Sequence, residues 1–115
     1  MDASGLNLAS LVQSSEGLCA LQRKDLQAGD LVYVKTCNSL YCIHVEDQSS
    51  FNVTGGWFDR NGSVPVRTSI AGCTWGGSII KVDIIAAIGL SLEFGNRVTT
   101  SAIRQIVVLR RERRN

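Results

Sequence analysis

Two stretches of alternating side chains, residues 31–36 and 40–46, constrain the fold of this chain more than any other feature. Apolar and polar residues alternate in both, which is the pattern of β-strands with one buried face. The link Asn38-Ser39 predicts a two-residue hairpin loop between them. The register that follows pairs Cys37 with Leu40, Lys35 with Cys42, Val34 with Ile43, Tyr33 with His44, and Val32 with Val45.

This hairpin has one apolar face, which we expect to lie in the core, and one polar face. The expected core face consists of Val32, Val34, Thr36, Tyr41, Ile43 and Val45. The other face carries Tyr33, Lys35, Cys37, Cys42, His44 and Glu46.

Further short strands are expected along the rest of the chain. They are residues 51–58, interrupted by Gly55-Gly56, and residues 64–70, 80–84, 90–94 and 106–109. Pro65 predicts an edge position for the second of these, because proline cannot donate to a ladder. Residues 102–106 are compatible with a single helical turn. About seven short antiparallel strands, with turns every eight to twelve residues, predict an all-β fold, a small and partly open barrel resembling SH3-like folds.

The 115 residues fit one domain. We divide it into an N-terminal segment, residues 1–27, a barrel domain, residues 28–109, and a basic tail, residues 110–115. The N-terminal segment is expected to be loose or to form short helices, with Leu8, Leu11 and Val12 on one apolar face. The sequence shows no secretory signal pattern and no stretch of the roughly 20 apolar residues that a membrane span needs. These features favour a cytoplasmic protein with reduced cysteines and no membrane association.

Cys37, Cys42 and His44 share the polar face of the predicted hairpin. With Cys19 or Cys73 they could complete a tetrahedral zinc site, and a Cys–His pair could also act as a nucleophile. However, the sequence has no Cys-x-x-Cys pair and none of the common catalytic motifs. We therefore expect neither a metal nor another cofactor, and a metal-binding protein or thiol enzyme is the alternative.

The most distinctive loop is the glycine-rich stretch at residues 72–77, which contains three glycines and one tryptophan. Trp75 could serve as a stacking or docking platform, with the amides of Gly76 and Gly77 close to a ligand. Trp57, which follows another glycine pair, is a second candidate, because one of two adjacent strand residues faces outward. These residues predict a site for a protein or small-molecule partner.

The last six residues hold four arginines and one glutamate, while the whole chain has a net charge of +2. The basic character of the chain therefore comes from its tail. The tail arginines, which could attract nucleic acid, are Arg110, Arg111, Arg113 and Arg114. A nucleic-acid-binding module is thus another alternative.

Three short segments, TWGGS at residues 74–78, GLSLEF at 89–94 and TSAI at 100–103, resemble small uncharacterised bacterial β-barrel proteins. The resemblance covers about the last forty residues and implies a barrel, but no activity or site residue. Aromatic residues in glycine-rich loops, without a catalytic motif, favour a non-catalytic binding or assembly module. Because an open barrel has unpaired edge strands, we also expect a homo-oligomer.

Overall fold

The computed structural model describes residues 18–61, 65–74 and 80–110 of the chain. These residues contain ten strands, one 3-10 turn and one short helix. The elements are β1 (Ala20–Gln22), η1 (Arg23–Asp25), β2 (Leu31–Thr36), β3 (Leu40–Val45), β4 (Phe51–Gly55), α2 (Gly56–Asn61), β5 (Val66–Thr68), β6 (Ile70–Thr74), β7 (Ile80–Lys81), β8 (Ile84–Ala87), β9 (Ser91–Phe94) and β10 (Ile103–Leu109). The all-β prediction is confirmed.

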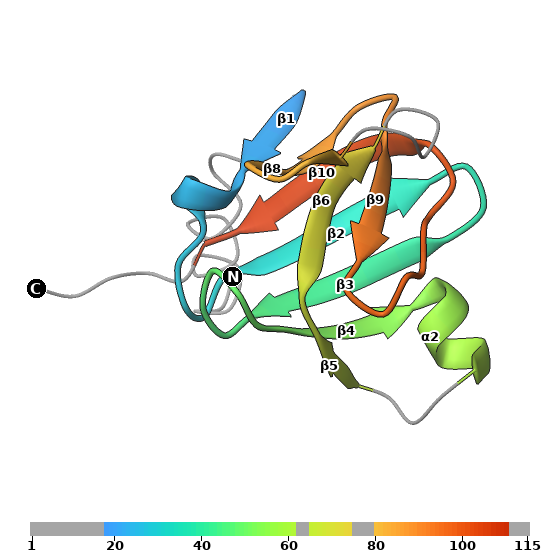
Figure 1. Cartoon of the computed structure of the whole chain (residues 1–115), viewed down its shortest axis with the longest axis horizontal. Helices are drawn as coiled ribbons and strands as arrows, with labels where there is room; N and C mark the ends of the chain where they lie inside the picture. Colours follow the sequence, from blue (N-terminus) through green and yellow to red (C-terminus); the bar gives the residue numbers. More distant parts are fainter. Residues whose placement is uncertain (1–17, 62–64, 75–79, 111–115) are drawn as a thin grey trace, which may run out of the picture.

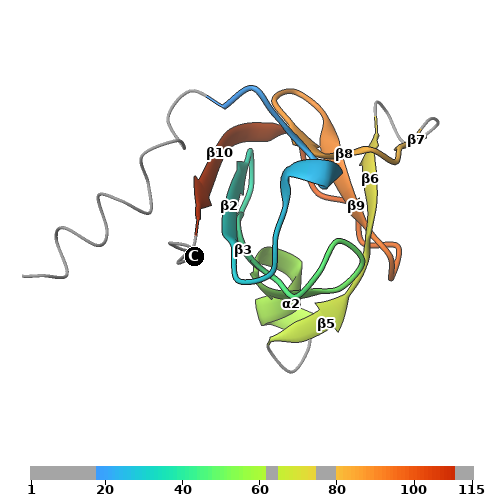
Figure 2. The same ribbon diagram turned by 90° about the vertical axis from the view of Figure 1, so that its left-hand side faces the viewer.

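The strands form three antiparallel sheets around one core. The largest sheet has the order β10-β2-β3-β4-β5, the second has the order β7-β6-β9, and β1 pairs with β8. In Figure 1, β6 and β9 cross in front of the large sheet. Figure 2 shows β10, β2 and β3 on one side and β6, β8 and β9 on the other, with α2 and β5 at the bottom. The described strands do not hydrogen-bond into one closed barrel.

The central hairpin has the predicted faces but not the predicted register. All six residues expected in the core are buried. Val34 lies opposite Tyr41 instead of Ile43, so the register is displaced by two residues. The amide of Thr36 donates to the carbonyl of Ser39 at 2.8 Å, which makes Cys37 and Asn38 the two turn residues. A displacement of two preserves the faces, because side chains alternate with a period of two.

The Thr36 hydroxyl explains where this turn forms. It accepts hydrogen bonds from the amides of Asn38 at 3.3 Å and Ser39 at 3.1 Å, and it donates to the Ser39 carbonyl at 3.1 Å. A threonine side chain that satisfies the backbone of a following turn stabilises that turn locally. The prediction considered the turn preference of Asn38-Ser39 and not the hydroxyl two residues earlier.

The expected strand at residues 51–58 is wrong after Gly55. Gly55 and Gly56 have φ values of +96° and +48°, which other residues rarely adopt, and the chain turns there from β4 into α2. A Cβ on Gly55 would lie 2.1 Å from the carbonyl oxygen of Leu40, so the turn also requires the absence of a side chain. The glycine pair therefore ends the strand, where the sequence had indicated an interruption, a bulge or a sharp bend, within it.

Three other boundaries differ from expectation. The stretch 64–70 divides after Thr68: β5 is the edge strand of the large sheet, as Pro65 indicated, and β6 joins the second sheet. The stretch 80–84 breaks at a turn, residues 82–83, into β7 and β8. Residues 102–106 are not helical, because β10 begins at Ile103 and pairs along β2.

Aromatic side chains fill one end of the core beneath α2. Phe58 is fully buried and meets Phe94 edge-on, with ring centroids 4.9 Å apart. Tyr41 packs on both rings, at 6.2 and 5.7 Å, and its hydroxyl accepts a hydrogen bond from the Trp57 amide at 3.4 Å. This packing of α2 closes the space between the sheets at the β4 side.

Arg23 joins three segments that are distant in the sequence. Its guanidinium donates to the carbonyls of Gln48 at 3.0 Å, Ile70 at 2.7 Å and Val82 at 2.8 Å. The fixed fork of donors in arginine suits such a set of carbonyls. Gln48 in turn donates from its amide nitrogen to the carbonyl of Leu26 at 3.2 Å. The segment after β1 is thus held against the rest of the core.

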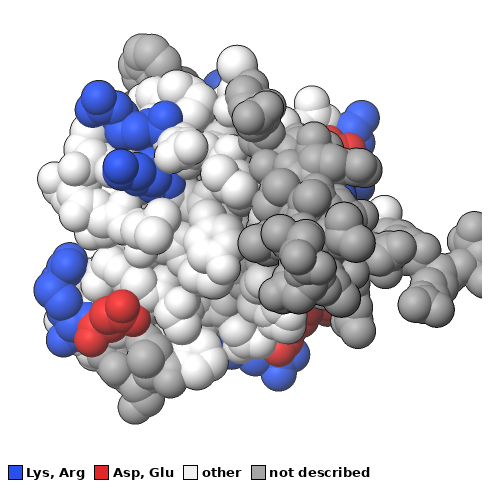
Figure 3. All heavy atoms as spheres, turned by 180° about the vertical axis from the view of Figure 1, so that it is seen from behind, with Lys and Arg blue, Asp and Glu red and all other residues white. Residues whose placement is uncertain are grey.

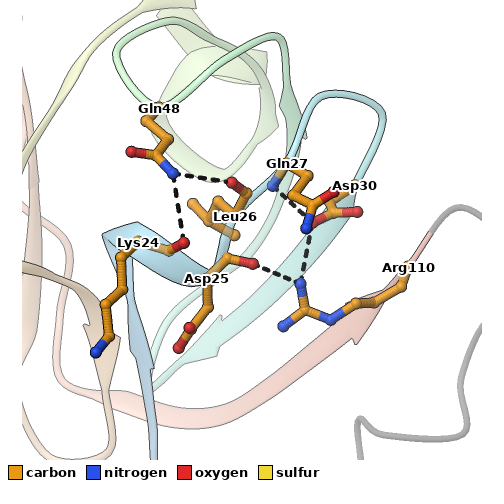
Figure 4. A network of polar contacts seen from close by, with 7 residues as sticks. All are labelled: Lys24, Asp25, Leu26, Gln27, Asp30, Gln48 and Arg110. Carbon is orange, nitrogen blue, oxygen red and sulfur yellow. Dashed lines mark hydrogen bonds and ion pairs between the residues drawn. The ribbon is translucent and has the colours of Figure 1, made fainter.

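Arg110, immediately after β10, holds the other side of the same segment (Figure 4). Its Nη1 donates to the carbonyl of Asp25 at 2.6 Å and pairs with Oδ2 of Asp30 at 3.2 Å. The Asp30 side chain is fully buried and also accepts a hydrogen bond from the Gln27 amide at 3.0 Å. Arg110 therefore belongs to the folded body, although the sequence placed it in the tail.

Candidate functional site

A groove of about 800 Å³ lies along the outer edge of β10, and we call it the β10 groove. Within the described residues, β10 is the last strand of its sheet and pairs with β2 on one side. The groove is lined by Leu18, Cys19, Lys35, Thr36, Cys37, Ile88, Arg104, Gln105, Ile106 and Val107. Its volume is in the range typical of ligand-binding clefts.

The turn of the central hairpin builds one wall of the β10 groove. The Cys37 amide donates to the carbonyl of Ala102 at 3.0 Å, and the Asn38 amide donates to the Ser101 hydroxyl at 3.2 Å. These bonds fix the hairpin turn to the segment that leads into β10. The position of the turn, set by Thr36, therefore decides where the Cys37 thiol lies in the groove.

The opposite wall comes from two other segments. The Ile88 amide donates to the carbonyl of Cys19 at 2.9 Å, and the Gly89 amide donates to the carbonyl of Ile103 at 2.8 Å. Leu18 packs against the core, while the Ile88 side chain remains 43% exposed. This wall is apolar, and it is held to β10 by backbone hydrogen bonds.

Two exposed cations, Lys35 and Arg104, give the groove its charge. Arg104 occupies an irregularity in the pairing of β10 with β2, between Ile103 and Gln105, and Nη1 of Arg104 lies 3.5 Å from the Cys37 sulfur. Among the lining residues that the structure describes, none is Asp or Glu. Figure 3 shows basic side chains gathered at the upper corner of this face, and a largely uncharged surface beside them. A groove of this kind attracts a ligand that combines carboxylates with apolar groups.

The outer face of the large sheet continues from the groove as a half-buried apolar stripe. Val107 lies opposite Tyr33, and Tyr33 lies opposite Cys42 on the next strand. The charge on Cys42 raises the pKa of the Tyr33 hydroxyl, with smaller contributions from their hydrogen bond and from burial. Such cross-strand neighbours pack side by side, so the stripe extends the apolar surface beyond the groove.

The structure does not bring together Cys37, Cys42 and His44, the residues of the alternative metal or thiol site. Cys37 lies in the hairpin turn beside Arg104, Cys42 faces Tyr33 across the strands, and His44 is exposed near the other end of β3. The described part of the chain contains no cluster of three or more His, Cys, Asp or Glu side chains that could share a metal ion. Cys73 is buried in the core, where its sulfur donates to the Ile85 carbonyl at 3.4 Å.

The aromatic candidates have different outcomes. Trp57 is 38% exposed on α2 and stands edge-on to Phe58, with ring centroids 5.4 Å apart. Of the adjacent residues Trp57 and Phe58, Trp57 does face outward, but the two residues lie in a helix and not in a strand. Trp75, Gly76 and Gly77 lie outside the described residues, as do the tail residues Arg111, Arg113 and Arg114.

Sequence reasoning missed the β10 groove. Lys35 was placed correctly on the outer face of the hairpin, but Arg104 was assigned to a helical turn and never connected with it. The available signal was the β-branched residues Ile103, Ile106, Val107 and Val108, which favour a strand that begins before residue 106. If β10 had been recognised as the pairing partner of β2, Lys35 and Arg104 would have been predicted to lie close together.

Comparisons with protein-family models, with curated proteins and with solved structures found no match to this chain. Among the described residues, no helix has the length and apolar character needed to cross a bilayer.

Proposed function

We propose that the protein is a non-catalytic peptide-binding module that holds a short segment of a partner protein in the β10 groove. The observation that carries this proposal is the pairing of two exposed cations with an apolar wall along an edge strand. Lys35 and Arg104 supply the charge, and Ile88 and Val107 supply the apolar contacts. The preferred ligand is a segment with alternating apolar and acidic side chains.

The two kinds of contact have different roles. An exposed ion pair contributes about 0.2–1 kcal/mol, while burial of apolar surface contributes about 25 cal/mol per Å². Apolar contacts therefore supply most of the affinity, and Lys35 and Arg104 select acidic ligands and orient them. For a shallow groove we expect a dissociation constant on the order of 10 μM, as in transient complexes.

The proposal also concerns how the three sheets are arranged. We interpret the three sheets as a partly open, SH3-like barrel whose opening lies at β10. The support is that the sheets surround one core, that α2 covers the β4 side, and that the edge of β10 beyond Ile103 has no strand partner among the described residues. An open edge beside a groove is a common place for a binding module to receive a peptide.

The test measures the binding of a short fluorescein-labelled peptide of alternating Leu and Glu by fluorescence anisotropy. We expect binding to the parent protein, and at least about ten-fold weaker binding to the double variant Lys35→Glu/Arg104→Glu. The matched control, Arg60→Glu/Lys81→Glu, carries the same change of charge at exposed positions outside the groove and should bind like the parent.

Two results would contradict the proposal. One is the absence of binding at peptide concentrations up to about 1 mM, which corresponds to less than about 4 kcal/mol of binding free energy. The other is equal affinity of the groove variant and the control variant. Binding of single-stranded DNA that is lost in the groove variant, without binding of the peptide, would replace the proposal by the nucleic-acid alternative.

A further inference from the structure

We infer that the resident occupant of the β10 groove is the chain's own N-terminal segment, residues 1–17, which a partner peptide must displace. This inference rests on the proposed function, because it assigns a ligand to the same groove. It makes the segment an intramolecular competitor that lowers the apparent affinity for partners.

The first argument is the place where this segment joins the described structure. Leu18 and Cys19 line the β10 groove themselves. Their position is fixed, because the Ile88 amide holds the Cys19 carbonyl and the following strand β1 pairs with β8. The N-terminal segment therefore reaches the folded body at the wall of the groove, with no intervening element.

The second argument is chemical complementarity. The segment contains the apolar residues Leu6, Leu8, Leu11 and Val12, and the carboxylates of Asp2 and Glu16. It contains no Lys or Arg, while Lys35 and Arg104 are the charged residues in the described part of the groove lining. Its composition is thus that of the ligand that the groove selects.

The third argument is proximity. Five residues separate Val12 from Leu18, so this apolar group can lie at most about 20 Å from Leu18. A short flexible link gives an effective concentration of about 1 mM. Even if the separate segment binds with a dissociation constant of about 100 μM, it then occupies the groove most of the time and weakens partner binding about ten-fold.

Disulfide trapping in the full chain tests the contact directly. In the variant Leu11→Cys, mild oxidation should link the introduced thiol to Cys37 within one chain, detected by mass spectrometry of the digested monomer. The control Ser10→Cys replaces a polar residue of the segment instead of an apolar one and should give at least about five-fold less of this link. Equal yields would overturn the inference, and a link formed mainly between two chains would replace it by exchange between copies.

Peptide binding separates this inference from the proposed function. The labelled Leu-Glu peptide should bind the full-length variant Leu8→Ser/Leu11→Ser about ten-fold more tightly than the parent, while the control Asn7→Ser/Gln13→Ser should match the parent. If the peptide binds all three with equal affinity, the groove binds peptides but the segment does not occupy it, and the inference alone fails. If the peptide binds none of them, the proposed function fails as well.

Discussion

The two edges of the large sheet, β5 and β10, differ in what lies beside them. Toward the β5 edge the chain turns at a glycine pair at the end of β4, and α2 places Phe58 between the sheets against Phe94. At the β10 edge the hairpin turn and the Ile88 turn stand apart, and the groove between them carries Lys35 and Arg104. The first edge is closed by apolar packing, which contributes stability. The second edge leaves charged and apolar side chains exposed along the groove.

The strongest test of this difference is Phe58→Ala. The substitution removes a fully buried ring from the aromatic cluster and leaves a cavity, so we expect a loss of about 3–5 kcal/mol in the free energy of unfolding. Urea denaturation followed by circular dichroism measures this loss. The neighbouring variant Trp57→Ala removes a partly exposed ring and should cost less than about 1.5 kcal/mol. Similar losses in both variants would show that α2 does not close the core in the way described.

The sequence predicted the faces of the central hairpin because alternation alone determines them. It did not predict the register, which depends on one side-chain hydroxyl at Thr36 that competes with the ordinary turn preference. Local pattern thus identified which residues are buried, while a specific hydrogen bond decided which residues are paired.

Other features depend on contacts between distant segments, and the sequence gave little sign of them. Arg23 donates to carbonyls 25 to 59 residues away, and Arg110 reaches Asp30 over 80 residues. The β10 groove likewise joins Lys35 and Arg104 through the pairing of β2 with β10. A short stretch such as residues 102–109, which is apolar except for Arg104 and Gln105, does not distinguish a strand from a helical turn by its period.

Arg110→Ala tests whether substitutions near β10 leave the free energy of unfolding unchanged everywhere or only within the groove. The substitution leaves the buried Asp30 carboxylate without this cationic donor, so we expect a loss of about 2–3 kcal/mol in the free energy of unfolding. The same denaturation experiment applies. Arg104→Ala, within β10 and exposed, should change the free energy by less than about 0.5 kcal/mol. A larger effect at position 104 than at 110 would reverse the assignment of structural and binding roles.

Cys73 provides a smaller test that depends on pH and concerns the closed core. Burial raises the pKa of its thiol to about 11, partly offset by a hydrogen bond to the backbone of Ala87. Above pH 9 the unfolded chain loses this proton while the folded chain keeps it, so stability falls as the pH rises from 9 to 11. At pH 10 the loss amounts to about 1.4 kcal/mol.

The measurement for Cys73 compares unfolding free energies at pH 8 and pH 10. Relative to the parent, Cys73→Ala should lack about 1.4 kcal/mol of this alkaline loss, while Trp57→Ala retains the thiol and should show the parent's full dependence. The same alkaline loss in Cys73→Ala and in the parent would mean that the thiol titrates alike in the folded and unfolded chains.

The smallest expected effect on stability belongs to the groove variant Lys35→Glu/Arg104→Glu. Both side chains are exposed, and no Asp or Glu stands beside them among the described groove residues, so their reversal removes no buried pair there and leaves no cavity. We expect the free energy of unfolding to stay within about 0.5 kcal/mol of the parent, measured in the same urea titration. Because this variant is also the one expected to lose peptide binding, an unchanged stability assigns that loss to the surface of the groove. A loss of more than about 1 kcal/mol would instead mean that the two cations support the fold, and the contrast between the edges would then disappear.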